Sequence, residues 1–249
     1  MKRCPQSVRL WLLLVLVAGL GLQLFFVLRV ASLALLDPGS SAFMRSEAWR
    51  ILNGPNPWHW QQQWVPYSQI SKQLKRAVVS AEDDGFSNHD GVDWEALEKA
   101  WQKNAQAQAR ADKKLARTNR QAPPPRAKVV GGSTITQQLA KNLFLSGERT
   151  LLRKGQELAL TLLLETLLSK QRILELYLNS VEWGDGIFGA EAAAQHYFRK
   201  PAARLNAAEA AKLAVMLPRP KYFEKRWHSD YLNARAAAIE NRLEHATLP

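Results

Sequence analysis

The chain has 249 residues, and 47% of them are hydrophobic, which is enough for one ordinary domain and an additional segment. Its net charge of +12 would suit a nucleic-acid-binding protein, but the excess lies in two segments. Residues 1–36 carry four basic residues and no acid, residues 99–128 carry nine against Asp112, and the remaining charges balance. The charge therefore does not predict binding to nucleic acid. The single cysteine, Cys4, excludes an intramolecular disulfide and a cysteine-based metal site.

The amino-terminal segment is apolar enough to span a membrane. From Leu10 to Leu28, nineteen residues contain one polar side chain, Gln23. As a helix they rise about 28 Å, close to the ~30 Å hydrocarbon core of a bilayer. Basic residues precede the segment, so the positive-inside rule predicts a cytoplasmic tail over 1–9, a transmembrane anchor over 10–36 and an outward-facing remainder. The alternative is a signal peptide cleaved after the small residues at 30–34.

Residues 37–65 are predicted to form a juxtamembrane connector, and residues 66–249 a single domain. Four aromatic residues lie where the two meet: Trp58, Trp60, Trp64 and Tyr67. Such side chains favour the membrane–water interface, but they would also pack well in a core. The sequence leaves both interpretations open.

Helical periodicity dominates the domain. The spacing of apolar residues predicts a helix over 68–81, and residues 93–104 begin another with an acidic first turn. Residues 103–128 lack an apolar stripe and end in prolines, which predicts an exposed, flexible, basic insert whose alanine-rich part can be helical. A glycine pair at 131–132 opens a further helix, and Asn206 with Glu209 forms a capping box for a later one. Strand signals are scarce, so the predicted fold class is mainly α.

Three acids, Glu82, Asp83 and Asp84, follow the helix predicted over 68–81. Neighbouring negative charges and partial burial both raise the pKa of a carboxyl group. One of the three is therefore a candidate general base near neutral pH. An ordinary solvated turn is the alternative for an acidic run of this kind.

A second acid and a group of cations follow downstream. Glu157 begins a leucine-rich run, where an acid needs a partner, and Glu165 and Glu175 lie in the same apolar context. Structural ion pairs with nearby basic residues would explain all three. A basic series after a helix start suits phosphate: Lys141, Arg149, Arg153 and Lys154. The series is neither a Walker A loop nor a dinucleotide fingerprint, and the histidines lack zinc-binding spacing.

Five blocks, in order over residues 66–222, resemble the peptidoglycan glycosyltransferases, which form the glycan-polymerising domain of class A penicillin-binding proteins and its monofunctional relatives. The blocks are EDDGFSNHDG, GGSTITQQLAKN, RKGQELALTLLLE, RILELYLNSVEWGDGIFGAEAAAQHYF and LNAAEAAKLAVMLPRP. The resemblance implies a lysozyme-like, mainly helical domain on one transmembrane helix, located on the periplasmic side of the bacterial inner membrane. It further implies polymerisation of lipid II, with inversion and with undecaprenyl pyrophosphate as leaving group. The implied partners are lipid II, the growing glycan strand, membrane lipid and other wall-synthesis proteins.

The same resemblance implies roles for individual residues. Glu82 would be the general base, and Glu157 would assist at the pyrophosphate, directly or through water or a divalent metal (Mg²⁺ or Mn²⁺), with no organic cofactor and no other metal site. The pyrophosphate would be neutralised by Lys141, Arg149 and Arg153. The cleft would be lined by Ser133, Thr134, Gln137 and Gln138. The site would be supported by Asp83, Phe86, His89, Glu175, Tyr177 and Asn179.

Two further patterns separate the alternatives. The sequence has neither a serine followed by lysine three positions later nor a Lys-Thr-Gly triplet, so penicillin-binding transpeptidase chemistry is not predicted. A lytic glycosidase on the same fold would need an acid to protonate a sugar leaving group and would have little use for the cation series. That series favours the polymerase, and an inactive membrane-anchored scaffold stays a further alternative.

Overall fold

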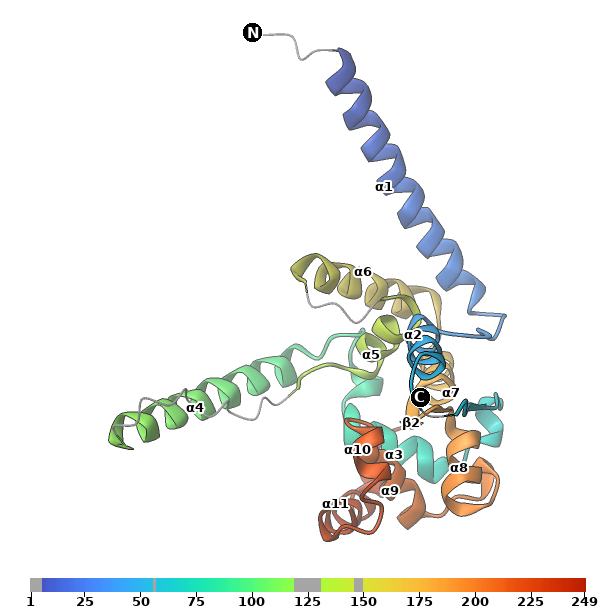
Figure 1. Cartoon of the computed structure of the whole chain (residues 1–249), viewed down its shortest axis with the longest axis vertical. Coiled ribbons are helices and arrows are strands. Elements are labelled where there is room, and N and C mark those ends of the chain that lie inside the picture. The colour runs from blue at the N-terminus through green and yellow to red at the C-terminus, as the bar shows by residue number, and fades with distance from the viewer. Residues whose placement is uncertain (1–5, 56, 119–130, 146–149) are drawn as a thin grey trace.

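The computed structural model describes residues 6–55, 57–118, 131–145 and 150–249. The α-helices are α1 (Gln6–Ser32), α2 (Ala42–Leu52), α3 (Lys72–Glu82), α4 (Trp94–Thr118), α5 (Ile135–Phe144), α6 (Leu151–Leu167), α7 (Lys170–Ser180), α8 (Ala190–Phe198), α9 (Ala207–Met216), α10 (Pro220–Glu224) and α11 (Asp230–Glu240). Figure 1 shows a helical body from which two long helices extend, α1 at one end and α4 to one side. The prediction of a mainly α fold behind one apolar amino-terminal helix is confirmed.

The strands of the described residues form one small sheet in the order β1-β3-β2. They are β1 (Gln61–Gln62), β2 (Glu182–Gly184) and β3 (Ile187–Phe188), with β1 parallel and β2 antiparallel to β3. Short 3-10 helices lie at Tyr67–Gln69, Phe86–Asn88, Ala202–Arg204 and Leu243–His245. The sheet joins the connector at β1 to the segment that follows α7.

Helix α1 is exposed along most of its length, and residues 7–32 are long and apolar enough to cross a membrane. Its carboxyl end is different, since Val30 and the following Leu33 are buried in the core of the body. The helix begins at Gln6, before the apolar run predicted over 10–28, and ends at Ser32. An apolar exposed shaft with a buried base fits a membrane anchor fixed to a domain.

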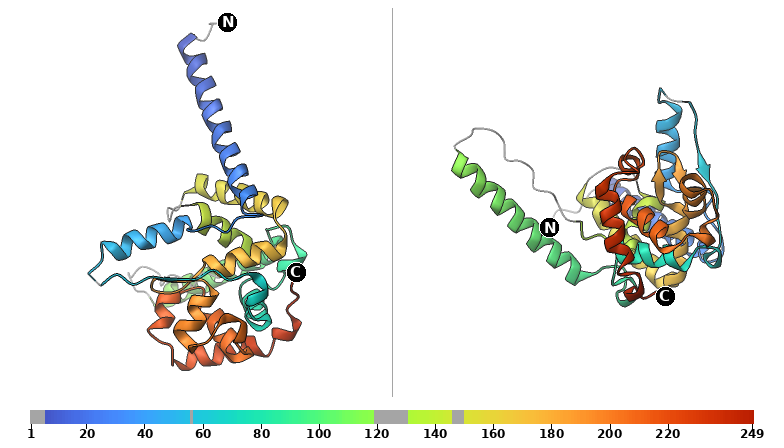
Figure 2. Two further views of the ribbon diagram at one scale, coloured as in Figure 1. Left: turned by 90° about the vertical axis from the view of Figure 1, so that its right-hand side faces the viewer. Right: turned by 90° about the horizontal axis from the view of Figure 1, so that it is seen from below.

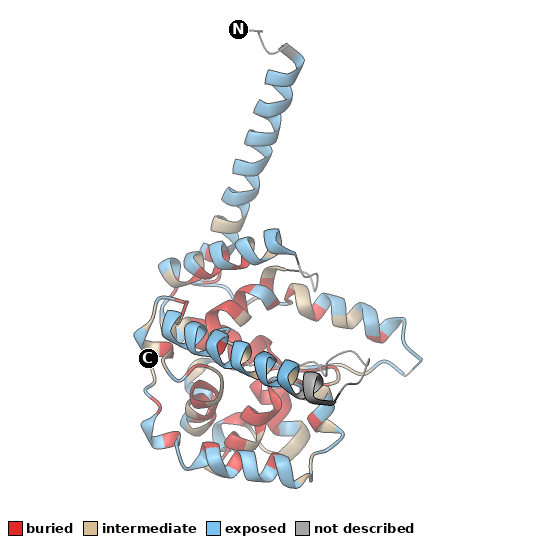
Figure 3. Ribbon diagram, turned by 90° about the vertical axis from the view of Figure 1, so that its left-hand side faces the viewer, coloured by how far each residue is buried: buried red, intermediate tan, exposed pale blue. Residues whose placement is uncertain are grey.

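The core of the body is built around α7 and the segment after it. Tyr177 and Trp183 are the largest fully buried side chains, and α3, α9 and α11 pack closely against one another. Figure 3 shows the buried residues gathered in the centre of the body, while α1 and α4 are mostly exposed. Helix α7, which follows the leucine-rich run, is buried along most of its length.

The ends of α3 are set by local chemistry. The helix begins at Lys72 because the Ser71 side chain accepts a hydrogen bond from the Leu74 amide, whereas residues 67–69 form a separate 3-10 turn. It is therefore shorter at its start than the predicted helix over 68–81. It ends at Glu82, so the first of the three adjacent acids is its last residue. The predicted capping box of Asn206 and Glu209 is confirmed at the start of α9.

Helix α4 extends away from the body, as the view from below shows (Figure 2). Residues 103–118 of the predicted insert continue this helix, although they have no apolar stripe. Asp93 accepts a hydrogen bond from the Ala96 amide and so caps the start of the helix. Residues 119–128 of the insert lie outside the described residues, and the predicted flexibility of the insert stays a prediction.

Candidate active site

Glu82 is held at the end of α3 by a chain of hydrogen bonds. Gln138 Nε2 donates to Glu82 Oε2 at 2.8 Å, and the buried Tyr177 hydroxyl donates to Gln138 Oε1 at 3.0 Å. Burial raises the pKa of Glu82, and Asp83 raises it further, while the Gln138 hydrogen bond and Lys141 oppose the shift. The net result is a raised pKa, as a carboxylate that accepts protons near neutral pH requires.

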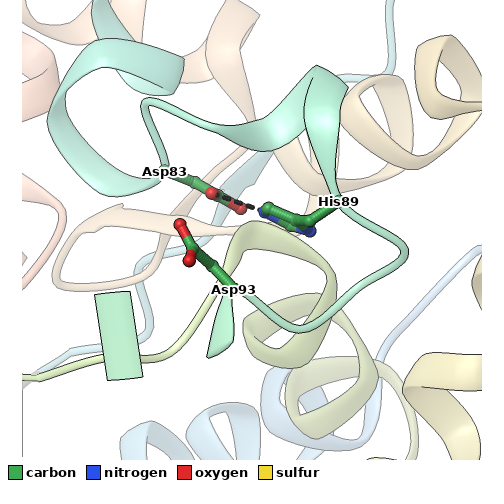
Figure 4. Close-up of side chains that lie close together, drawn as sticks. All are labelled: Asp83, His89 and Asp93. Atoms are coloured by element: carbon green, nitrogen blue, oxygen red, sulfur yellow. Dashed lines mark hydrogen bonds and ion pairs between the residues drawn. The ribbon is translucent and has the colours of Figure 1, made fainter. Parts of the chain in front are cut away.

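Asp83 joins the first sequence block to the second. Its Oδ1 accepts from His89 Nε2 at 2.8 Å (Figure 4), and its Oδ2 accepts from the Ile135 amide at 3.0 Å. His89 Nδ1 in turn accepts from the Gly91 amide, so the imidazole donates through Nε2. Asp83 therefore fixes the start of α5 against the loop that follows Glu82, whereas Asp84 is exposed.

A partly buried group of polar side chains lies behind this loop. Lys170 Nζ donates to the His89 carbonyl at 2.5 Å and to Glu165 Oε1 at 2.9 Å, and it lies 4.6 Å from the centre of the Phe86 ring. The Thr136 hydroxyl also donates to Glu165. Thr136 and Lys170 are supports that sequence reasoning did not assign. Lys170 acts across 81 positions of the sequence, and no local pattern shows that separation.

Gly91 is required where the loop meets α6. Its φ is +85°, and an added Cβ would lie 2.7 Å from Thr161 Cγ2 and 2.8 Å from Glu165 Cγ. Its carbonyl accepts a hydrogen bond from the Thr134 hydroxyl at 2.6 Å. A side chain at this position would therefore force the loop away from α6 and disturb its hydrogen bond with Thr134 at the start of α5.

We expect Gly91→Ala to lower the free energy of unfolding by about 2 kcal/mol or more, because strain at positive φ adds to overpacking. Thermal unfolding of the full chain measures this change. Gly155→Ala is the matched control, since Gly155 is exposed on α6 and nothing lies within 4 Å of an added Cβ. Alanine there should be neutral or stabilising. Equal melting temperatures for the two variants would contradict the role given to Gly91.

Polar side chains at the start of α5 form hydrogen bonds within the helix end itself. The Thr134 hydroxyl accepts from the Gln137 amide, and Gln137 Oε1 accepts from the Thr134 amide, so the two residues form a capping box. Both side chains are buried. The Ser133 carbonyl lies 3.5 Å from Gln138 Nε2. Of the four residues predicted to line the cleft, Gln138 lines the cavity that the structure shows, and substrate contact by all four stays a prediction.

Two of the four predicted cations lie at the amino-terminal part of α6. Arg153 Nη1 donates to Glu157 Oε2 at 3.0 Å, and Lys154 forms an ion pair with Glu157 Oε1. Glu157 is only 4% exposed, so both of its oxygens are neutralised where water is scarce. The pKa of Lys141 is lowered, first by desolvation and then by Arg153 and Lys154, while Glu157 opposes the shift. Arg149 lies outside the described residues.

A cleft of about 540 Å³ lies between α2, α5, α6 and the segments around β2 and α10. Its lining residues are Phe43, Ser46, Glu47, Gln138, Lys141, Asn142, Leu145, Arg153, Val181, Glu182, Leu217, Pro218 and Pro220. Gln138 thus touches Glu82 on one side and the cleft on the other. Two of the predicted cations, Lys141 and Arg153, line the cleft, and Gln138 connects it to Glu82, which is not among the lining residues.

Sequence reasoning missed one wall of this cleft. Glu47 lies on α2 within the predicted connector, and Glu182 lies on β2. Lys221 ties them together, since its Nζ pairs with Glu47 and lies 3.2 Å from Glu182 Oε1. Burial raises the pKa of Glu182 to about 7, although Lys221 opposes the shift. The Ser41 helix cap was a local signal for α2, but nothing local placed that helix on the cleft.

The remaining predicted supports lie on α7. Asn179 exchanges hydrogen bonds with the backbone of Val65 and so holds the connector, and Glu175 pairs with Arg172 at 2.8 Å. Tyr177 is the member of the helix that reaches the Glu82 chain. The three residues therefore lie along one buried helix. Of the three, only Tyr177 is connected to the predicted base, through its hydrogen bond to Gln138.

Two groups of described residues place possible metal ligands within 4.8 Å of one another: Asp83, His89 and Asp93 (Figure 4), and Glu47, Glu182 and Asp185. In the first group, both carboxylate oxygens of Asp83 already accept hydrogen bonds, from His89 and from the Ile135 amide. In the second group, the Lys221 ammonium lies among the three carboxylates. Glu157 belongs to neither group, and both of its oxygens bind cationic side chains. The described residues therefore do not fit a metal resident at Glu157.

A carboxylate with a raised pKa lies beside a cleft whose wall carries cations, on a helical body behind an apolar helix, and this combination fits the predicted glycosyltransferase class. The sequence model of the transglycosylase family matches residues 56–244, and the chain belongs to this family. It is 52% identical over 232 residues to a biosynthetic peptidoglycan transglycosylase of Burkholderia thailandensis, covering 93% of this chain and 84% of that one. A protein of the same name from Bordetella pertussis is 50% identical over 227 residues, covering 91% and 88%. The expected family, and with it peptidoglycan glycosyltransferase activity, is confirmed.

Proposed function

We propose that the chain polymerises glycan strands from lipid II, inverting the anomeric carbon and releasing undecaprenyl pyrophosphate, without transpeptidase activity. One arrangement carries this proposal: Gln138 links the Glu82 carboxylate to a cleft that Lys141 and Arg153 also line. In the proposed topology α1 crosses the bacterial inner membrane, residues 1–9 are cytoplasmic, and the catalytic body is periplasmic at the membrane surface, where a lipid-linked substrate is found.

Glu82 takes the proton from the 4-hydroxyl of the acceptor N-acetylglucosamine. The hydroxyl oxygen attacks C1 of the growing strand, a new C–O bond forms, and the bond from C1 to the pyrophosphate oxygen breaks. The electron pair leaves with the pyrophosphate, so no acid is needed to protonate a sugar oxygen. Gln138 and Tyr177 keep the Glu82 carboxylate turned toward the acceptor. The reaction thus needs one base and a cationic leaving-group site.

Lys141 and Arg153 stabilise the negative charge that develops on the departing pyrophosphate, and Arg149 is proposed to join them. Glu157 orients Arg153 and Lys154 through its two ion pairs. Because its oxygens are already paired, we derive no step through a protein-bound metal. We expect any dependence on Mg²⁺ or Mn²⁺ to arise from the pyrophosphate of the lipid, and no organic cofactor is needed for this transfer.

The acidic limb of the pH dependence of the reaction should follow Glu82. Because Glu82 must be ionised to act as base and its pKa is raised, kcat/KM should fall as the pH drops through a value above the ordinary glutamate range. The hydrogen bond from Gln138 lowers that pKa, so Gln138→Ala should move the acidic limb to higher pH. An acidic limb that stays in place in the variant would contradict the assignment of this limb to Glu82.

The direction of the reaction on peptidoglycan tests the proposed function. Purified full-length protein in detergent should convert labelled lipid II into long strands and should leave preformed cell-wall glycan intact. Shortening of the preformed glycan without growth from lipid II would establish a lytic glycosidase instead. Absence of both activities in a folded protein would support an inactive scaffold.

A further inference from the structure

An arginine of α7 binds the backbone at the end of α1. Helix α1 ends at Ser32, and the turn that follows exposes backbone carbonyl groups with no partner inside the helix. Arg172 Nε donates to the Leu33 carbonyl at 2.8 Å, and Nη2 donates to the Leu36 carbonyl at 3.0 Å. A cation also interacts favourably with the negative carboxyl end of a helix. Arg172 therefore caps the helix that we propose to span the membrane.

The same guanidinium makes two ion pairs. Nη2 lies 2.7 Å from Asp37 Oδ1, and Nη1 lies 2.8 Å from Glu175 Oε1. The side chains of Arg172 and Glu175 are 15% and 14% exposed, so their charges are largely shielded from water. All three guanidinium nitrogens are thus engaged in one fixed geometry, which a lysine cannot reproduce.

Apolar contacts reinforce this junction. Val30 and Leu33 are buried in the core, and the Phe26 ring packs edge-on against Phe144 at 6.1 Å between ring centres. Phe144 is the last residue of α5, one turn beyond Lys141. The base of the anchor therefore packs against a helix that carries residues of the cleft.

Helix α7 leads from the junction to the predicted base. Tyr177 lies five positions after Arg172 on this buried helix, and its hydroxyl holds Gln138, which holds Glu82. The anchor and the site are thus joined through one helix and two hydrogen bonds. If α1 were joined to the body only by a flexible linker, no such chain of contacts from the anchor to the site would be expected.

We propose that Arg172 is a positioning residue that locks the membrane helix to the catalytic body and so keeps the cleft at a fixed height and orientation over the bilayer. A substrate whose lipid tail stays in the membrane presents its pyrophosphate at a nearly constant depth. A body that tilted freely would bring Lys141 and Glu82 to that depth only part of the time. The catalytic part of this proposal rests on the proposed function, and the structural part does not.

Distance measurements test the lock without any substrate. Spin labels are placed at Leu24→Cys on α1 and Arg204→Cys on the body, in full-length protein that carries Cys4→Ser and is reconstituted in lipid nanodiscs. The wild-type background should give one narrow distance distribution, and Arg172→Ala should broaden it. The matched control is Arg235→Ala, since Arg235 is exposed on α11 and makes no side-chain interaction among the described residues. An equally narrow distribution in Arg172→Ala would overturn the proposal.

Activity measurements test the consequence. We expect Arg172→Ala to lose about tenfold or more of its rate on long-chain lipid II in vesicles, because misplacement of the reacting groups is costly. On a short-chain, water-soluble lipid II in detergent, Arg172→Ala should stay near the wild-type rate. The control variant Arg235→Ala should stay near the wild-type rate on both substrates. Equal losses on both substrates would show that Arg172 acts on the site itself and would overturn the positioning role.

Arg172→Lys keeps the proposal testable if the alanine variant does not fold. It retains the charge beside Glu175 and Asp37 but cannot supply the same set of hydrogen bonds, so we expect a partly broadened distribution and an intermediate rate on vesicles. A wild-type distribution in this variant would overturn the proposal. If the wild-type protein polymerises nothing, the proposed function fails, while the distance measurements still decide whether the lock exists.

Discussion

Glu82→Gln should reduce polymerisation of lipid II by about 10²–10⁴-fold, the contribution expected of a general base. The amide can still accept the hydrogen bond from Gln138, so the shape of the site should survive while its ability to take a proton is lost. The loss should appear in kcat, since the base acts on the bound acceptor. Product formation from labelled lipid II measures it.

Asp84→Asn is the matched control for this variant. Asp84 is two positions away and exposed, and it has no part in the hydrogen bonds that hold Glu82. Its neutralisation should leave the rate within twofold of wild type. Normal polymerisation by a folded Glu82→Gln protein would remove Glu82 from the mechanism.

Lys141→Met should reduce kcat by about 10²–10³-fold, because it removes a cation from the place where the leaving pyrophosphate gains charge. The methionine preserves most of the apolar stem, so packing around α5 should change little. Lys225→Met is the matched control, since Lys225 is exposed beyond α10 and forms no ion pair among the described residues. A higher KM with an unchanged kcat would show that Lys141 binds the substrate without stabilising its transition state.

The sequence predicted those features that depend on neighbouring residues. Apolar spacing and capping residues located α3, α5 and α9 to within a few residues, and they placed Glu82 at the end of its helix. The apolar run likewise identified α1. These features are local, because a helix is fixed by its own periodicity and by the hydrogen bonds at its ends.

Contacts between distant segments could not be predicted in the same way. Glu47 and Lys221 pair across 174 positions, and neither residue carries a local sign of the cleft. Arg172 lies three positions before Glu175, which predicts no more than a local ion pair, although it binds carbonyls 136 and 139 positions away. Helix α4, by contrast, agrees with the local expectation that the alanine-rich part of the insert can be helical, because its alanines and long polar side chains favour a helix even without an apolar stripe to bury.

The most direct test of the central claim counts two products in one reaction. Full-length protein is given lipid II, and the new glycosidic bonds and the released undecaprenyl pyrophosphate are measured over time. Transfer with pyrophosphate as leaving group predicts one released lipid for each new bond, at a rate that Glu82→Gln lowers for both products alike. New bonds without released pyrophosphate, or release without new bonds, would contradict the mechanism.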